Sequence, residues 1–280
     1  MKVTLLGTGS PLPSATCAGP STLVQAGAHN ILVDAGRAVV LRLVGAMCPP
    51  PAVTAVLLTH LHSDHICDLN DVVTTRWVAS PAAGPLDIYG PPGTRQMVDG
   101  MLAMLSADVG YRLDHHDDLR AVGAPVVTVH EVSAGDSVVI GDVTVHVHPT
   151  DHRPVAPTIG FRIEHDGKVA ALAGDTIPCD GLDTLCAGAD VYVQTVVRED
   201  LVRTFAGLIP TGQRFLDILD YHSTVQQAAQ TAARAKVHTL LLTHFVPPLQ
   251  PGQEDEWRAM AAEHFGGDIV VGPDLTSVEV

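Results

Sequence analysis

Residues 60–65, His-Leu-His-Ser-Asp-His, place four potential metal ligands within six positions. They follow the apolar run 53–58, whose aliphatic and β-branched side chains, closed upstream by three prolines at 49–51, indicate a buried strand. The potential ligands therefore lie where a strand ends, and a strand held by a core fixes ligand directions better than a mobile loop does. Imidazole and carboxylate groups together suit zinc, iron or manganese. We expect a metal centre here rather than a polar turn that holds three histidines by chance.

Length and composition favour one globular unit. The chain has 280 residues, of which 46% are hydrophobic and 17% charged, so we predict a single domain over residues 1–280. No apolar run reaches the roughly 18 residues that a membrane span needs, and the glycine-interrupted N-terminus does not resemble a signal peptide. The five cysteines form no Cys-x-x-Cys pair. We therefore predict a cytoplasmic protein without a membrane partner or a disulfide framework.

The charge balance bears on the partner. The formal net charge is -15, and the only lysines are Lys2, Lys168 and Lys236. Without a basic tract to follow a phosphate backbone, long nucleic acid is an unfavoured partner, although it is not excluded. Bound divalent cations would offset the negative charge locally, so a small anionic ester fits the metal site better.

The pattern of strands and helices indicates an α/β fold. Two groups of strands are each followed by helices, which predicts two mixed sheets packed face to face with helices outside. The polar stretches 111–123 and 198–221 resemble long excursions of the kind that border active sites. Strands are expected at 2–6, 21–26, 30–33, 56–58, 86–89, 126–132, 143–148, 158–163, 169–173, 189–197 and 239–243, and helices at 37–46, 69–78, 93–107, 224–235 and 254–264.

Three further ligand candidates follow predicted strands. His152 lies beyond the strand at 143–148, Asp175 beyond that at 169–173, and His244 beyond that at 239–243. Singly, each would more often be a turn or cap residue. Thr59-His60 and Thr243-His244 repeat one strand-Thr-His arrangement, however, and the three candidates together favour a shared metal site.

With these residues in place, the sequence resembles the metallo-β-lactamase superfamily, in its ribonuclease Z and arylsulfatase-like branch. The resemblance spans nearly the whole chain and implies a four-layer αββα sandwich. The motifs that carry it are Leu6-Gly7-Thr8-Gly9-Ser10, Gly19-Pro20-Ser21, Val33-Asp34-Ala35-Gly36, the 60–65 cluster, His152, Gly174-Asp175-Thr176, Tyr221-His222-Ser223-Thr224 and Thr243-His244-Phe245.

The resemblance implies a pair of divalent ions, zinc before manganese or iron. It assigns His60, His62 and His152 to one ion, and Asp64, His65 and His244 to the other. Asp175 would bridge the two ions. Paired ions of this kind supply a bridging hydroxide as the nucleophile, with Asp64 among the catalytic groups. Degenerate, non-catalytic relatives generally lose ligands, and all seven candidates are present here, so a scaffold role is disfavoured.

His222 would act differently from the ligands. The matching histidine of the resembling enzymes lies beside the metals as an acid or phosphate contact, so His222 is expected to protonate the departing oxygen. The alternative is a residue that only begins a helix, with Ser223 or Thr224 as its cap. Ribonuclease Z enzymes place a His-Glu pair after the bridging aspartate, whereas this chain has Gln194 nearby, which leaves open whether Gln194 supports His222.

Another departure concerns substrate. The tRNA-processing enzymes carry a glycine-rich arm between the third metal histidine and the bridging aspartate, but only 22 residues separate His152 from Asp175 here. We therefore expect a dinuclear hydrolase of phosphodiesters or aryl sulfates, with ribonuclease Z as the alternative. A lactonase or thioesterase on the same fold is a further alternative. Relatives in this branch often dimerise, so a homodimer stays open.

Several other charged residues are candidates for the site. Arg153, Arg198 and Arg203 are candidates for holding the anionic oxygens of a substrate, although solvated surface positions are the stronger expectation for each. His148 is the competing candidate for third ligand of the first ion, although His152 is preferred. We expect His115-His116 to lie in a solvated loop, with a gate beside the site or an adventitious metal site as the alternatives.

Overall fold

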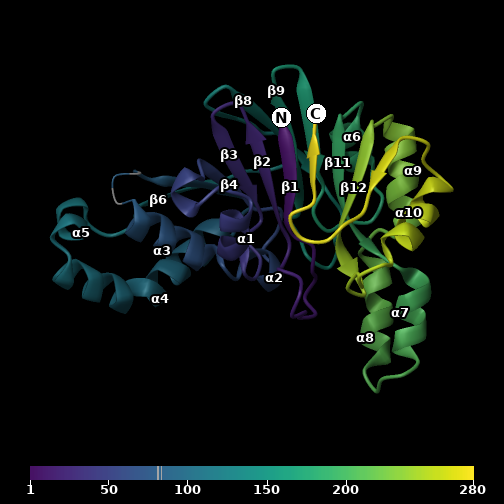
Figure 1. The fold of residues 1–280 in the computed structure, drawn as a ribbon, viewed down its shortest axis with the longest axis horizontal. Coiled ribbons are helices and arrows are strands. Elements are labelled where there is room, and N and C mark those ends of the chain that lie inside the picture. Colours follow the sequence, from purple (N-terminus) through teal and green to yellow (C-terminus); the bar gives the residue numbers. More distant parts are fainter. Residues whose placement is uncertain (81, 83) are drawn as a thin grey trace.

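Two seven-stranded sheets pack face to face in the computed structural model, which describes residues 1–80, 82 and 84–280 (Figure 1). Helices from the first half of the chain cover one sheet, and helices from the second half cover the other. This arrangement confirms the predicted four-layer αββα fold with two mixed sheets. Among the helices of the described residues, none is long and apolar enough to span a membrane.

The first sheet joins the two ends of the chain. Strands β14, β1, β2 and β3 are antiparallel neighbours, and β3 through β6 are parallel. Met1 and Val280 are hydrogen-bonded to each other at this edge. In spatial order the strands are β14 (Ser277–Glu279), β1 (Lys2–Gly7), β2 (Ser21–Ala26), β3 (His29–Val33), β4 (Ala55–Leu57), β5 (Leu86–Gly90) and β6 (Val127–Glu131).

The second sheet has the same design in the second half of the chain. Strands β7 through β10 are antiparallel, and β10 through β13 are parallel. In spatial order they are β13 (Asp268–Val270), β12 (Thr239–Val246), β11 (Val191–Val197), β10 (Lys168–Leu172), β9 (Ile159–His165), β8 (Val143–Pro149) and β7 (Ser137–Ile140).

Three buried layers hold the sandwich together. The central layer lies between the sheets and includes Leu5, Phe161 and Leu241, each 0% exposed. The outer face of the first sheet packs on α1 (Val39–Gly45), α3 (Leu69–Ala79) and α4 (Thr94–His115), and the short α2 (Ser63–Ile66), α5 (Asp117–Val122) and η1 (Pro50–Ala52) lie on the same side. The outer face of the second sheet packs on α6 (Asp180–Cys186), α9 (Val225–Ala235) and α10 (Glu254–Ala262).

Several predicted boundaries were wrong. The stretch 111–123 is helical rather than an irregular excursion, because α4 continues to His115 and α5 follows. Arg112 pairs with Asp108 and Arg120 with Asp117, and such pairs support helices that bury few apolar residues. The stretch 198–221 is also helical, forming α7 (Glu199–Ala206), α8 (Gly212–Asp217) and η3 (Ile218–Asp220). Strands β7, β13 and β14 and helix α6 were not predicted, since they are short and carry few periodic residues.

The carboxylate of Asp274 fastens the loop after β1 to the C-terminal segment. It accepts hydrogen bonds from Thr8 N at 2.9 Å, Thr8 Oγ1 at 2.8 Å and Ala18 N at 2.7 Å, and pairs with Arg42 Nε at 2.8 Å. The side chain is only 5% exposed. Because a buried charge without partners is costly, these four contacts stabilise the Asp274 carboxylate and hold the loop after β1 against the C-terminal segment.

Asp274→Ala is expected to lower the free energy of unfolding by about 3 kcal/mol, since the donors it satisfies would lose a buried charged partner. The measurement is urea denaturation followed by circular dichroism. Asp268→Ala is the matched control, because the Asp268 side chain is exposed on an edge strand. A loss for Asp274→Ala no greater than that of the control would contradict the structural role.

Candidate metal centre

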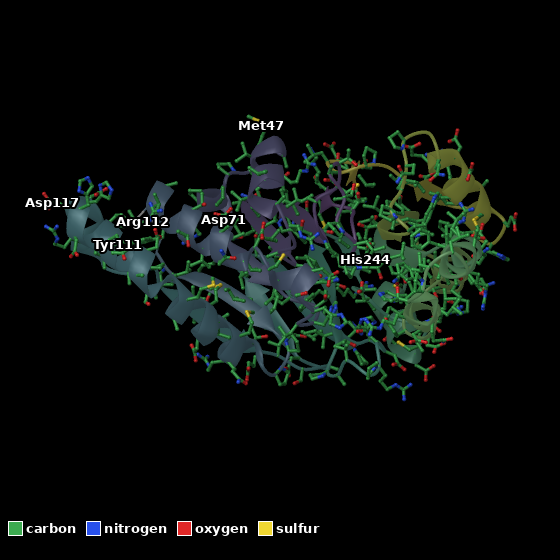
Figure 2. All side chains as sticks on the ribbon, turned by 90° about the horizontal axis from the view of Figure 1, so that it is seen from below. Met47, Asp71, Tyr111, Arg112, Asp117 and His244 are labelled. Carbon is green, nitrogen blue, oxygen red and sulfur yellow. The ribbon has the colours of Figure 1, made fainter. Side chains whose placement is uncertain are left out.

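The ends of strands from both sheets bring the seven predicted ligands together. His60 follows β4, and His62 immediately precedes α2, which contains Asp64 and His65. His152 and Asp175 follow β8 and β10 of the second sheet, and His244 lies within β12. In Figure 2, His244 lies between the purple and blue elements of the first half and the green elements of the second.

The ligand atoms divide into groups in which all atoms lie within 4.8 Å of one another. One group combines His60, His62 and His152 with Asp175, and another combines Asp64, His65 and His244. Asp175 also groups with His222 and His244. The grouping matches the two predicted ligand sets and places Asp175 in contact with both, where a bridging ligand has to lie.

One oxygen of Asp175 lies at the middle of these groups. Its Oδ2 is 3.2 Å from His222 Nε2, 3.4 Å from His65 Nε2, 3.5 Å from His244 Nε2 and 3.9 Å from both His60 Nε2 and His152 Nε2. Gly174 allows this approach: its φ is +66°, and a Cβ there would lie 2.8 Å from Thr59 Cβ. Only glycine fits at position 174 without displacing the strand end that carries His60.

The donor set fits a pair of divalent cations. His65 Nε2 and Asp175 Oδ1 are buried and have no hydrogen-bond partner among the described residues. Leaving such atoms unsatisfied costs about 1–3 kcal/mol each, so a native protein has a reason to place them there. Imidazole nitrogens and carboxylate oxygens at this density are typical ligands of zinc and of related divalent ions. The residues present therefore suit the predicted metals.

Asp34 orients two of the histidines, a role that the sequence analysis did not assign to it. His65 Nδ1 donates to Asp34 Oδ2 at 2.8 Å, which turns His65 Nε2 toward the centre. Thr59 Oγ1 also donates to Asp34 Oδ2 at 2.8 Å and lies 3.0 Å from His60 Nδ1. The position of Asp34 directly after β3, matching that of the ligands after their own strands, is the signal that could have identified it.

Backbone carbonyls orient two more histidines. His152 Nδ1 donates to the carbonyl of Tyr221 at 2.7 Å, and His222 Nδ1 donates to the carbonyl of Ile218 at 3.0 Å. In both rings Nε2 is left to face Asp175. Gln194 does not contact His222: it is buried, accepts from Tyr192 Oη and donates to the carbonyl of Thr195. The question left open by the sequence is therefore answered: the hydrogen-bond partners of Gln194 lie elsewhere, and the Ile218 carbonyl orients His222.

His244 reaches the centre through a local distortion of β12. The strand continues to Val246 instead of ending at residue 243, and its register with β11 shifts between the pairs Thr195–Thr243 and Val197–Val246. The extra residue on β12 marks a bulge, and His244 has a φ of +51°. A bulge re-aims a side chain, which accounts for a ligand inside a strand and for a non-glycine residue in the left-handed region.

Burial and carboxylates set opposite protonation tendencies in the ligands. Burial lowers the pKa of His152 to about 4 and, helped by the neighbouring His65, holds the pKa of His60 well below its ordinary value. Burial alone would lower the pKa of His65, but Asp175 and Asp34 raise it well above that value. His60 and His152 are thus neutral at pH 7, as a metal ligand has to be, whereas a cation that bound His65 would displace a proton.

The other candidate histidines, His148, His115 and His116, lie outside the ligand cluster. His148 Nδ1 contacts Thr184 Oγ1 at 3.2 Å, and His148 belongs to none of the ligand groups found among the described residues. His115 and His116 lie at the junction of α4 and α5, beside Asp117. Figure 2 places Asp117 at one tip of the molecule and His244 near its middle, so the gate alternative for His115-His116 is wrong.

A pocket of about 250 Å³ opens beside the ligand cluster. His62, Asp175, His222 and His244 form one side of it. The three candidate arginines pair with carboxylates: Arg153 with Asp151, Arg198 with Asp200, and Arg203 with Glu199. Arg153 and Arg203 are exposed, as expected, whereas the expected surface position is wrong for Arg198, which is buried. The arginine that lines this pocket is Arg214 of α8, which the sequence analysis did not single out. The stretch 198–221 does border the site, as predicted, although it is helical.

Comparison with known proteins places these features in context. Residues 29–245 match the family described as the Beta-lactamase superfamily domain. The chain is 56% identical over 284 residues to a ribonuclease Z from Mycolicibacterium gilvum, covering 100% of this chain and 96% of the relative. It is 55% identical over 282 residues to a ribonuclease Z from Mycobacterium bovis (strain BCG / Pasteur 1173P2), covering 100% of this chain and 98% of the relative.

Solved structures show the same fold at lower identity. A metallo-β-lactamase fold protein from Bacillus subtilis superposes with a TM-score of 0.73 at 22% identity, covering 99% of this chain and 98% of that one. The short form of human tRNase Z superposes with a TM-score of 0.71 at 23% identity, covering 100% of this chain and 99% of that one. At these identities the likeness concerns the fold.

Asp34→Asn is expected to weaken metal binding by about 10–100-fold, because the ring orientation of His65 depends on this carboxylate. Metal retained after dialysis against a graded series of chelator concentrations would be measured by elemental analysis. Asp142→Asn is the matched control, since Asp142 contacts His29 and His165 outside the ligand cluster. Equal metal retention by the two variants would remove the orienting role of Asp34.

Proposed function

The chain belongs to the metallo-β-lactamase superfamily and to its ribonuclease Z branch; from this premise we propose that it is a metal-dependent endoribonuclease that hydrolyses a phosphodiester bond of precursor tRNA. The proposal rests on the 55–56% sequence identity, over the full length of the chain, to proteins named ribonuclease Z. This similarity favours ribonuclease Z, the alternative in the sequence analysis, over a hydrolase of small esters. A cytoplasmic location, where such a substrate would be met, belongs to the same proposal.

The missing arm does not oppose an RNA substrate. The alignment with the M. gilvum relative has 284 positions against the 280 residues of this chain, which leaves no space for a long insertion between His152 and Asp175. Proteins named ribonuclease Z therefore share the short connection. The absence of the arm therefore does not distinguish RNA from a small ester.

The negative net charge is also compatible with RNA. The value of -15 is a sum over the whole chain, whereas a scissile phosphate responds to the charges within about 10 Å at ordinary ionic strength. A pair of divalent cations at the ligand cluster would outweigh the two carboxylates of Asp64 and Asp175 there. We therefore place the phosphate beside the ligand cluster and the rest of the RNA along the pocket.

Each predicted ligand has a defined role in this proposal. His60, His62 and His152 would hold one cation, Asp64, His65 and His244 the other, and Asp175 both. When bound, the cations supply a nucleophile from water at neutral pH and offset the charge that develops on the phosphate. The protein residues fix the ligand directions through Asp34, Thr59 and the Tyr221 carbonyl.

His222 is placed to handle the leaving oxygen. Its Nδ1 is occupied by the Ile218 carbonyl, so any further proton is carried on Nε2, which faces the pocket. As water adds to phosphorus and the P–O bond to the leaving oxygen breaks, that oxygen needs a proton, and His222 Nε2 supplies it. Its Nε2 lies 3.2 Å from Asp175 Oδ2, which places it next to the ligand cluster.

A small-ester hydrolase is the second candidate. The observation in its favour is the apolar wall of the pocket, formed by Leu12, Phe215, Ile218 and Val246, which would accept the aryl group of a phosphodiester or a sulfate ester. Arylsulfatase-like activity belongs here.

A substrate panel separates the two candidates. The purified protein is expected to remove the 3′ trailer of a precursor tRNA, and to turn over bis(p-nitrophenyl) phosphate and an aryl sulfate much less efficiently by kcat/KM. Cleavage would be followed on denaturing gels, with Asp175→Ala as the blank and a chelator to abolish activity. Efficient turnover of either small ester without trailer cleavage would move the assignment to the second candidate.

His222→Ala is expected to retain its metals but to lose about 10²–10⁴ in kcat on RNA, whose leaving oxygen needs protonation. The loss on bis(p-nitrophenyl) phosphate should be much smaller, because p-nitrophenolate departs without a proton. Metal content and both rates would be measured on the same preparation, with His148→Ala as the matched histidine control. Wild-type turnover of RNA by His222→Ala would remove the assignment.

A further inference from the structure

Helices α7 and α8 form a hairpin that projects from the body of the molecule (Figure 1). The hairpin is a packed element: Phe205 and Phe215 contact each other with ring centroids 5.2 Å apart, and a Cβ on Gly212 would lie 2.0 Å from the carbonyl oxygen of Ala206. Phe215 and Ile218 also pack on the buried cluster of Val197, Val202 and Val246. Residues on α8 are thereby held at fixed positions relative to the sheet.

The second helix of this hairpin forms a wall of the catalytic pocket. Arg214 and Phe215 line the same 250 Å³ space as His222 and His244. That space lies below the roughly 300–1,000 Å³ of pockets that enclose drug-sized ligands, so it suits a single flat group. Leu12, from the loop after β1, lines the pocket as well, and its side chain is 37% exposed. The wall is therefore apolar and aromatic, with one cation.

Arg214 differs from the other arginines near the site. Arg153, Arg198 and Arg203 each pair with a carboxylate, whereas Arg214 forms no ion pair with any residue in 1–80, 82 or 84–280. An exposed guanidinium without an ion-pair partner, beside the ligand cluster, can bind an anionic oxygen of the substrate. In a chain with a formal charge of -15, an unpaired arginine at the pocket provides a local positive charge that favours an anionic substrate.

Ser10 provides a second polar group without a partner in the same pocket. Its side chain is 1% exposed, and its Oγ has no hydrogen-bond partner among the described residues. Neighbouring Thr8 is satisfied by Asp274, so the loop itself is well ordered by hydrogen bonds. A buried hydroxyl that lines a pocket and lacks a partner indicates a ligand that supplies one.

We propose that Phe215, Arg214 and Ser10 form a nucleotide subsite next to the scissile phosphate: Phe215 stacks on a base, Arg214 binds the adjoining phosphate, and Ser10 hydrogen-bonds the sugar or phosphate. The inference rests on the proposed function, because it requires a nucleotide substrate. Unpaired bases are commonly recognised by stacking on aromatic side chains, and Phe215 is the aromatic residue that the α8 wall presents to the pocket. The hairpin thus selects a single-stranded nucleotide over a phosphate alone.

Steady-state kinetics of the metal-loaded protein on precursor tRNA test Arg214. Arg214→Ala should raise KM by about tenfold while kcat falls less, and it should reduce the salt dependence of log kcat/KM by about one phosphate contact. Arg214→Lys should recover most of the loss. Arg203→Ala is the matched control, because Arg203 lies on α7 and pairs with Glu199. An Arg214→Ala variant that behaves as Arg203→Ala does would overturn the phosphate contact.

Competitive inhibition tests the base independently of RNA cleavage. With bis(p-nitrophenyl) phosphate as reporter, uridine 5′-monophosphate should inhibit about tenfold more tightly than ribose 5-phosphate, because only the nucleotide stacks. Phe215→Ala should abolish the preference, and Phe205→Ala, which changes the other ring of the pair outside the pocket, should keep it. Equal inhibition by the two compounds, or phenyl phosphate as tight as the nucleotide, would overturn the subsite. A preference for the nucleotide without trailer cleavage would support the subsite and reject the tRNA substrate.

Discussion

A single carboxylate oxygen organises the centre of this molecule. Asp175 Oδ2 lies within 3.9 Å of the Nε2 atoms of five histidines, which come from both sheets and from the loop before α9. Burial alone would raise the pKa of Asp175, but His244 and His65 hold it well below its ordinary value. A charged carboxylate at this depth is stable only if cationic or metal partners surround it, so the strand ends of both sheets must meet there.

The segment between β11 and α9 has two tasks at once. Its backbone carbonyls at Ile218 and Tyr221 orient His222 and His152, and its side chains on α8 line the pocket. Thr224 then begins α9 with a capping box formed with Gln227, which fixes the path of the chain immediately after His222. Ligand orientation and substrate contact therefore depend on the same stretch, residues 198–224, and a change in its packing would disturb both.

The choice between RNA and a small ester shows the limit of two kinds of sequence argument. The short connection between His152 and Asp175 favours a small ester on sequence grounds, but the aligned ribonuclease Z relatives lack space for an arm there too. Net charge is a sum over the surface, whereas binding depends on the local field. Arg214 changes that field at the pocket, and its neighbours in sequence do not reveal that it is unpaired and next to the ligand cluster.

The sequence by itself determined the fold class and the strand-end positions of the candidate ligands, and the family resemblance implied their division into two sets. The first two are properties of local pattern: apolar runs form strands, and polar residues that follow them lie at strand ends. The tertiary structure decided what depends on contacts between distant segments. The bulge that turns His244 inward, the role of Asp34 beneath His65, and the carbonyls that hold His152 and His222 are examples. Every residue has the same backbone carbonyl, and a register shift depends on the neighbouring strand. Neither feature can therefore be predicted from the amino-acid sequence.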